Sequence, residues 1–150
     1  MKIKQLSLFI ENKPGQLLIP CKILADTGIN IITLSLADTQ QFGILRLIVK
    51  PWQKAKTILE KAGCVVKVND VVAIEVQDRS GGLAEIIKTI DDAKLNIEYM
   101  YAFTCGGDGK AVLVFRFEDI DLATSNLQSR GVNMIASVEL YQRAEKFKNT

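Results

Sequence analysis

The sequence of 150 residues contains no histidine, and this absence excludes several common active sites. A Ser-His-Asp triad, a Cys-His nucleophile pair and a histidine-ligated zinc site all require an imidazole group. Acid–base catalysis by histidine is excluded for the same reason. The absence of histidine therefore excludes most of the familiar hydrolytic mechanisms.

Cysteine is also scarce, and its spacing excludes a paired-thiol motif. Cys21, Cys64 and Cys105 lie 43 and 41 residues apart, so the chain has no Cys-x-x-Cys metal or redox pair. We interpret them as packing residues. The odd number of cysteines and the lack of a signal peptide predict reduced thiols in the cytoplasm. The apolar runs are well short of the about 18 residues that a membrane span needs.

An excess of charge of one sign is missing as well. Nineteen basic and seventeen acidic residues leave a net charge of +2, which predicts neither a nucleic-acid partner nor a membrane partner. Apolar residues make up 48% of the sequence and charged residues 24%, a balance that is typical of a folded globular protein.

The sequence contains two copies of one unit. At an offset of 66 residues Gly15 falls on Gly81 and Asn30 falls on Asn96, and at an offset of 68 Gly63 falls on Gly131. This self-similarity predicts a tandem duplication with its boundary near residues 69 and 70. We expect a first unit over residues 1–69, a second over residues 70–140, and a polar tail over residues 141–150 that is either loose or helical.

Each unit is predicted as strand, helix, strand, strand, helix, strand from its hydrophobic periodicity and turn signals. Pro20 falls inside the first predicted helix, where an interior proline would kink it. The fold class that fits is α+β, with two ferredoxin-like βαββαβ units in tandem, antiparallel sheets and helices on one face. The predicted strands cover residues 4–10, 31–37, 43–49, 64–68, 71–76, 99–104, 111–117 and 132–138, and the predicted helices cover 15–27, 52–62, 83–93 and 120–130.

The strand-to-helix loops are the strongest candidates for a binding site. The first contains Asn12-Lys13-Pro14-Gly15, and the second runs from Asp78 to Gly82. Glycine lets the backbone approach a ligand closely, and the N-terminus of the following helix suits a carboxylate. These residues can equally be explained as simple turn formers, and the loops alone do not decide between the two interpretations.

Other candidate motifs have structural explanations. Residues 106–110 contain three glycines and a lysine, but the spacing is not that of a phosphate-binding loop and a strand follows, so we expect a hairpin turn. Asp119 and Asp121 open a predicted helix, where the helix dipole favours acidic side chains. We therefore predict no catalytic residue, no metal site and no cofactor.

The duplicated pattern resembles the ACT domain. It consists of an apolar strand, then Asn12-Lys13-Pro14-Gly15, then a helix that ends before Asn30, and it covers nearly the whole chain twice. The resemblance implies small regulatory modules that pair side by side and bind amino acids at the seam between partners. In a serine-sensing member of the family, an asparagine in the loop and one after the first helix hold the amino acid. Those roles fall on Asn12 and Asn30, and in the second copy on Asp78 and Asn96.

The resemblance therefore implies a set of ligand-binding residues in the loops and at the starts of the following strands. That serine sensor also uses a histidine where this chain has Ile10, so serine is not implied as the ligand, and Asp78 would repel a ligand carboxylate. The implied residues are Asn12, Lys13, Pro14, Gly15, Gln16, Leu17, Asn30, Ile31, Asp78, Arg79, Ser80, Gly81, Gly82, Leu83, Asn96 and Ile97.

From these observations we expect a non-catalytic regulatory protein that binds an amino acid at the interface between ACT-like units, and that forms a homodimer. The alternative is a structural interaction module without a ligand, which docks on a separate enzyme. An enzyme of the acylphosphatase type, which shares this fold, would need an arginine-bearing glycine loop after the first strand. Arg79 lies near that place, but the surrounding pattern is absent.

Overall fold

A computed structural model describes residues 1–103 and 108–146 of the chain. The chain divides into two compact units, which we call the first unit (Lys4–Asn69) and the second unit (Met1–Ile3 with Asp70–Thr150). Cys105 and the first two residues of the predicted hairpin turn at residues 106–110 lie outside the described residues. None of the helices in the described ranges is long and apolar enough to cross a membrane.

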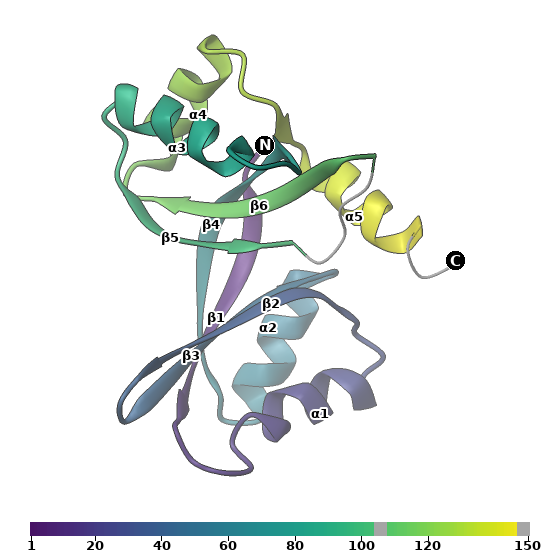
Figure 1. Ribbon diagram of the computed structural model, residues 1–150. Coiled ribbons are helices and arrows are strands. Elements are labelled where there is room, and N and C mark those ends of the chain that lie inside the picture. The colour runs from purple at the N-terminus through teal and green to yellow at the C-terminus, as the bar shows by residue number, and fades with distance from the viewer. Residues whose placement is uncertain (104–107, 147–150) are drawn as a thin grey trace. The chain divides into compact units, whose positions relative to one another are not determined.

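The first unit has the predicted order of elements, ending in the first part of β4 (Figure 1). Its strands lie side by side in the order β2-β3-β1-β4, and β3 pairs antiparallel with both of its neighbours. This places β2 at an edge of the sheet. The elements are β1 (Ile3–Glu11), α1 (Leu18–Asp26), β2 (Ile31–Thr39), β3 (Phe42–Val49), α2 (Trp52–Lys61) and β4 (Val65–Gln77).

Alternating residues of the strands form the core of the first unit. Leu8 lies opposite Leu45, and both are fully buried together with Leu6 and Leu47. The helices complete this core from the same face, because their apolar side chains, such as Leu24, belong to the same buried cluster. The two-residue period in the strands and the helical period in α1 and α2 thus specify one shared interface.

Pro20 does not lie in the interior of the first helix, because the helix starts later than predicted. The sequence predicts a helix from residue 15, which would place Pro20 in its interior. In the structure α1 begins at Leu18, so Pro20 is the third residue of the first turn. The first four N–H groups of a helix have no intrahelical partner, so a proline here costs no hydrogen bond. Pro20 is instead buried.

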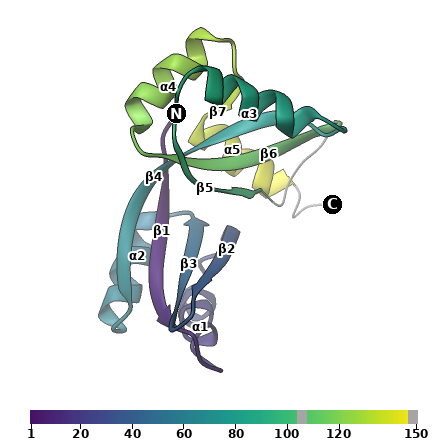
Figure 2. The ribbon, with the colours of Figure 1, turned by 60° about the vertical axis from the view of Figure 1, so that its left-hand side comes forward.

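The second unit repeats the same order of elements, and this confirms the predicted fold class. Its strands follow the order β5-β6-β4 with β7 on the other side of β4, and all of these pairs are antiparallel. Helices α3 and α4 cover one face of this sheet (Figure 2). The elements are the last part of β4, α3 (Gly82–Asp92), β5 (Ile97–Ala102), β6 (Lys110–Phe117), α4 (Ile120–Ser129) and β7 (Met134–Ile135).

The duplication is visible in the backbone as well as in the sequence. Residues with positive φ recur at the same offsets of 66 and 68, including one pair in which glycine is replaced by lysine. The repeated backbone geometry supports two copies of one unit rather than a chance similarity of patterns. The pairs are Gly15 (86°) and Gly81 (86°), Gly28 (69°) and Lys94 (55°), Gln40 (50°) and Asp108 (57°), and Gly63 (88°) and Gly131 (74°).

Two predicted strands are one strand in the structure. Residues 64–68 and 71–76 were expected as the last strand of one unit and the first strand of the next, but β4 runs without interruption through both. The division between the units, at Asn69 and Asp70, falls inside this strand. The sequence offers Asn69-Asp70 as a break, because both residues are turn formers. Strand pairing on either side of them overrides that preference.

The prediction of a strand over residues 132–138 is wrong at both ends. Strand β7 contains only Met134 and Ile135, and α5 (Ser137–Lys146) begins two residues later. Leu140 and Ala144 are buried and lie four residues apart, so they share one face of this helix. The helix covers residues 141–146 of the predicted polar tail, and of the two conformations expected for that segment these residues adopt the helical one.

A buried carboxylate joins α5 to the sheet of the second unit. The side chain of Glu75 is 6% exposed, and it accepts hydrogen bonds from Lys110 Nζ, Asn133 Nδ2 and Arg143 Nη1, each at 2.8 Å. Glu75 alternates with the core residues of β4, so α5 reaches the face of the sheet opposite to α3 and α4. Burial raises the pKa of Glu75, but the three hydrogen bonds outweigh burial and hold the pKa below its ordinary value.

We expect Glu75→Gln to lower the free energy of unfolding by about 2 kcal/mol at neutral pH, because two cationic donors lose their charged partner. The folded-state pKa of Glu75 is depressed, so its contribution is complete above the ordinary value of 4.5 and is lost as the pH falls through the folded value. Urea denaturation at about pH 7 and about pH 3 should therefore show a smaller difference between wild type and variant at the acidic pH.

The matched control is Glu98→Gln. Glu98 accepts a hydrogen bond from Arg116 at 3.0 Å, but its side chain is 42% exposed. An exposed ion pair of this kind contributes little to the free energy of unfolding, so Glu98→Gln should lower it by less than about 0.5 kcal/mol. Equal losses for the two variants would contradict the role assigned to Glu75.

Candidate functional site

The loop between β1 and α1 holds six of the predicted ligand residues, Asn12 to Leu17, in a defined backbone conformation. The N–H of Asn12 donates to the carbonyl of Gln41 at 3.0 Å, which ties the loop to the turn between β2 and β3. Gly15 has a φ of 86°, a value that side chains disfavour, and it reverses the chain before the helix. The turn-forming interpretation thus accounts for Gly15. It does not account for the side chains on either side of Gly15, which can still contact a ligand.

The N-terminus of α1 is open to solvent. Leu17 occupies the N-cap position, where no side chain of the described residues caps the helix. Leu17, Leu18 and Ile19 are 40%, 65% and 46% exposed. Uncapped N–H groups at a helix start carry a partial positive charge and can bind a carboxylate.

A small cavity of about 80 Å³ lies beside this loop, and both signs of charge border it. Lys13 Nζ lies 2.6 Å from Glu11 Oε2, and the hydrogen bond between them raises the pKa of Lys13, which therefore remains protonated. Asn12 Nδ2 donates to the carbonyl of Gln40 at 3.2 Å, which leaves Oδ1 as an acceptor. The lining residues are Ile10, Glu11, Asn12, Lys13, Leu17, Leu36, Asp38 and Gly43.

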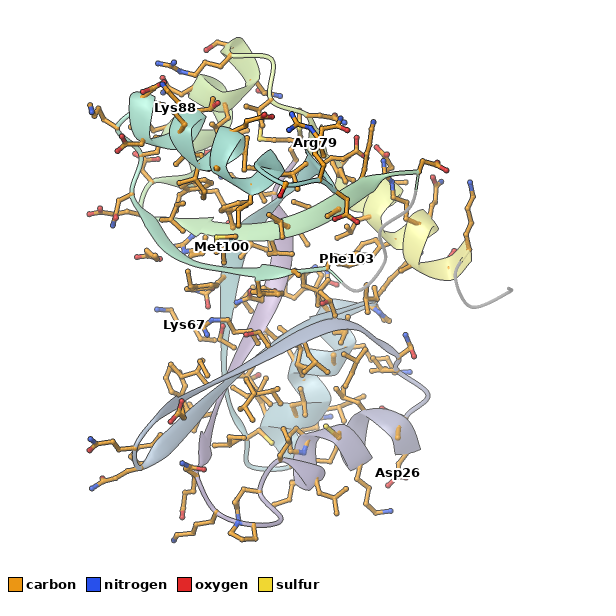
Figure 3. The ribbon with its side chains drawn as sticks, viewed as in Figure 1. Asp26, Lys67, Arg79, Lys88, Met100 and Phe103 are labelled. Atoms are coloured by element: carbon orange, nitrogen blue, oxygen red, sulfur yellow. The ribbon has the colours of Figure 1, made fainter. Side chains whose placement is uncertain are left out.

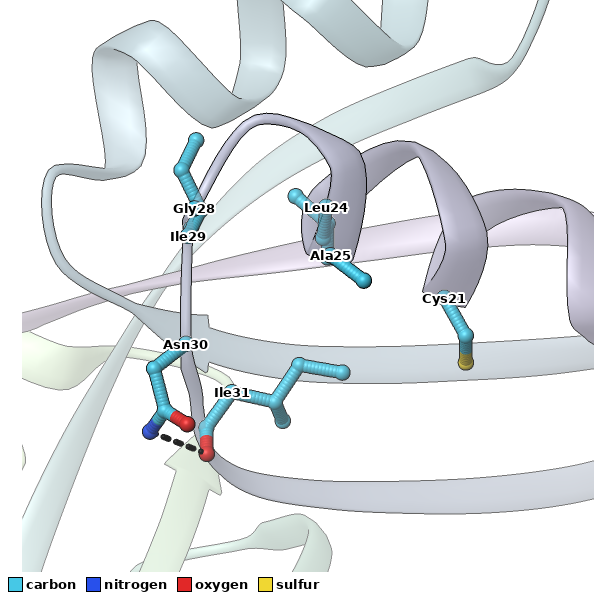
Figure 4. Close-up of a pocket in the computed structure, with 7 residues that line it drawn as sticks. All are labelled: Cys21, Leu24, Ala25, Gly28, Ile29, Asn30 and Ile31. Atoms are coloured by element: carbon cyan, nitrogen blue, oxygen red, sulfur yellow. Dashed lines mark hydrogen bonds between the residues drawn. The ribbon is translucent and has the colours of Figure 1, made fainter.

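Asn30 and Ile31 line a second and larger cavity of about 390 Å³, between the end of α1 and the start of β2 (Figure 4). Asn30 Nδ2 donates to the carbonyl of Ile31 at 2.9 Å, which leaves its Oδ1 as an acceptor. The side chain of Asn30 is exposed. The other lining residues are Cys21, Leu24, Ala25, Gly28 and Ile29.

A single copy of the first unit does not bring Asn12 and Asn30 together. Asn30 directly precedes β2, whereas Asn12 is hydrogen-bonded to Gln40, directly beyond the other end of that strand. Nine residues of β-strand at about 3.3 Å each separate the two side chains by about 30 Å. No amino acid spans that distance, so one unit cannot supply both asparagines to one ligand.

The loop between β4 and α3 is a conformational copy of the first loop. The N–H of Asp78 donates to the carbonyl of Gly109 at 2.9 Å, as the N–H of Asn12 does to Gln41. The N–H of Gly82 donates to the carbonyl of Arg79 at 3.0 Å, as the N–H of Gln16 does to Lys13 at 3.3 Å. The predicted correspondence between the loops therefore extends to their hydrogen bonds.

The side chains of the second loop make different contacts. Arg79 Nη2 donates to Glu85 Oε1 at 2.6 Å, and Arg79 Nη1 donates to the carbonyl of Ser80 at 3.2 Å, so the guanidinium group lies beside the start of α3 (Figure 3). Asp78 and Leu83 are exposed. A Cβ atom on Gly82 would overlap the carbonyl oxygen of Gln77, so this glycine is required by close packing.

Asn96 lies in a more charged setting than Asn30. It lines a cavity of about 280 Å³ together with Lys94, Glu118 and Asp119, and with Leu95, Phe117 and Leu122. Ile97 begins β5 and is half-buried outside that cavity. The second copies of both predicted positions are therefore present, but their surroundings have diverged.

Several residues that line the cavities were not predicted from the sequence. Asp38 lies opposite Gly43, and Gly43 lies opposite Ile10, so strand register brings Asp38 to the first loop. The alternation of Leu36 and Asp38 along β2 was the available signal, but it does not identify the partner strand. Cys21 and Ala25 are four residues apart on α1, and that helical spacing could have placed them on one face.

Comparison with protein families gives one description for the chain. A family model described as an ACT domain pair matches residues 1–144. A comparison with curated proteins finds no match.

Solved structures with the same arrangement include three that cover most of the chain. Protein BT0572 from Bacteroides thetaiotaomicron is 35% identical, with a TM-score of 0.86 over 94% of this chain and 96% of that chain. The regulatory subunit of aspartate kinase from Thermus thermophilus, in its ligand-free form, is 18% identical, with a TM-score of 0.62 over 85% and 90%. That subunit from Thermus flavus is 16% identical, with a TM-score of 0.60 over 93% and 91%.

We expect Gly82→Ala to destabilise the protein more than Gly81→Ala. Gly81 has a φ of 86°, so alanine there should cost about 1 kcal/mol of backbone strain, with the nearest atom at 3.9 Å. At Gly82 the new methyl group would overlap the backbone oxygen of Gln77, and relieving that overlap should cost more than about 2 kcal/mol. Thermal unfolding of the two variants measures the order, and the reverse order would refute the close packing.

Proposed function

The chain belongs to the family of ACT domain pairs, and we propose that it is a non-catalytic regulatory protein that binds an amino acid through its first unit. An amino acid carries a carboxylate, which needs N–H or cationic donors, and an ammonium group, which needs oxygen acceptors. The start of α1 and Lys13 supply the donors. Asp38 and the Oδ1 atoms of Asn12 and Asn30 supply the acceptors.

The observation that carries this proposal is the placement of Asn12 and Asn30 at opposite ends of an edge strand. If two copies pair antiparallel along β2 about a two-fold axis near Ser35, the start of one strand lies beside the end of the other. Asn30 of one copy then lies next to Gln40, and so to Asn12, of its partner. The two cavities of one unit thereby become the two halves of one site.

The exposed apolar surface beside this edge supports a homodimer of that kind. Leu34 and Leu36 on β2 are each 49% exposed, and Leu18 and Ile19 on α1 are also exposed. A free strand edge next to apolar side chains is a ready surface for pairing with another strand. The cavity of about 80 Å³ at the first loop is also too small by itself for a ligand site, which usually has at least about 300 Å³.

In this arrangement the ligand acts by stabilising the paired state. A ligand that contacts both copies binds the docked state more tightly than the separate copies, and it shifts the population toward that state. We expect the regulated enzyme to be a separate chain that distinguishes the two states.

The first prediction uses a screen of the twenty amino acids by thermal shift. A ligand at a hundred times its Kd should add about 2.7 kcal/mol of stability, which raises Tm by several degrees in a chain of this size. Asn12→Ala and Asn30→Ala should each abolish the shift given by the amino acid that is most effective on wild type. Mixing the two variants and allowing the copies to exchange should restore part of the binding.

The reason for the recovery is that each mixed dimer has one site with both asparagines intact. With random exchange, about a quarter of the wild-type number of sites should return, measured by isothermal titration calorimetry. If wild type binds and the mixture recovers nothing, both asparagines act within one copy and the split site is wrong. If none of the twenty amino acids binds wild type, the alternative of a docking module without a ligand is favoured.

The second prediction concerns the dimer itself. Leu34→Lys places a charge on the proposed pairing edge and should weaken self-association by more than about tenfold, measured by analytical ultracentrifugation. The control Val65→Lys changes a residue of the first unit that is 64% exposed and lies outside β2, and it should leave association unchanged. A wild-type protein that is monomeric at all concentrations would contradict the proposal directly.

A further inference from the structure

The side chains that line the cavity beside Asn30 are uncharged, and most of them are apolar, next to polar surface from Asn30 and the backbone. Apart from the Asn30 amide, its side chains come from Cys21, Leu24, Ala25, Ile29 and Ile31, with Gly28 between them. Leu24 and Ile29 are 1% and 5% exposed, so they form part of the core beneath the cavity. Figure 4 shows the side chains of Cys21 and Ile31 directed into the space between α1 and the start of β2.

Among the residues that the structure describes, no charged side chain lines this cavity. The nearest charged residues along α1, Lys22 and Asp26, lie 3.6 Å from each other as an exposed ion pair, and neither belongs to the lining. A charged group placed in the cavity would lose part of its hydration without gaining a partner of opposite charge. An apolar group would instead remove the surface of Cys21, Ala25 and Ile31 from water, which is favourable.

The two halves of the proposed site therefore have different roles. The half at the first loop carries Glu11, Lys13 and Asp38, which suit the charged end of an amino acid. The half at Asn30 adds one amide oxygen and polar backbone atoms, and its other lining side chains are apolar. A ligand held by its charged end at the first half would place its side chain against the second.

The second unit shows how this wall changes when charges are introduced. At the offset of 66 residues Ala25 is replaced by Asp91 and Gly28 by Lys94. Lys94 lines the cavity of Asn96, together with Glu118 and Asp119. The wall of uncharged side chains is found in the first unit and not in the second. The selectivity for the ligand's side chain is therefore assigned to the first unit.

We infer that the ligand is an amino acid with an apolar side chain, such as valine, leucine, isoleucine or methionine, and that Cys21, Ala25 and Ile31 select it. This inference rests on the proposed function, because it takes the amino-acid class of ligand from there. It adds the side chain that the site accepts and the residues that make the selection.

The test is calorimetric titration of the full chain with leucine, valine, methionine, serine, aspartate and lysine. We expect binding of the apolar amino acids at least tenfold tighter than binding of the other three. Ala25→Asp should weaken leucine binding at least tenfold. The matched control is Ala62→Asp, which makes the same change at the exposed end of α2, outside the lining of both cavities of the first unit.

Each outcome bears on a different part of the argument. Tight binding of serine, aspartate or lysine with no binding of the apolar amino acids would overturn the selectivity and leave the proposed function standing. Leucine binding that is equally strong in wild type and Ala25→Asp would overturn the assignment to this cavity. Failure of all six, and of the remaining amino acids, would overturn the proposed function itself.

Discussion

One backbone hydrogen bond, present in both units, fixes the geometry on which the candidate site depends. The first residue after the opening strand donates to a carbonyl in the following hairpin, from Asn12 to Gln41 and from Asp78 to Gly109. This bond holds the loop beside the far end of the second strand, and the second strand then sets the distance to Asn30. The separation of the two asparagines follows from the length of a strand, and side-chain rearrangement cannot remove it.

The two units keep this framework and differ in the side chains attached to it. Glu75 stands where the first unit has Phe9, which is 46% exposed, and Lys110 stands where it has Phe42, which is 50% exposed. In the second unit these two positions form an ion pair that also binds α5 through Arg143. Repetition of a fold therefore does not imply repetition of a site, because the contacts that specify the fold are largely backbone and core contacts.

Most of the fold could be predicted from the sequence, because its signals are local or periodic. Glycines at matching offsets, helical stripes and alternating strands gave the order of elements and the fold class. The continuous strand β4 and the start of helix α5 were missed, since each depends on pairing or packing with distant residues. Asn12 and Asn30 could be named from the resemblance to ACT domains, but their separation became evident only once strand register was known. Asp38 was missed because it reaches the first loop only through Gly43 and Ile10.

The position of β2 at the sheet edge would have a consequence for how the proposed regulator responds in the cell. If each site is completed by a second copy, occupancy depends on the abundance of the protein as well as on the abundance of the metabolite. At low expression the copies would be separate, and the protein would bind little of the metabolite. The metabolite concentration needed to fill half of the sites would fall as expression rises. By mass action, the gene's own level of expression would then set the range of amino-acid concentrations that the protein can report.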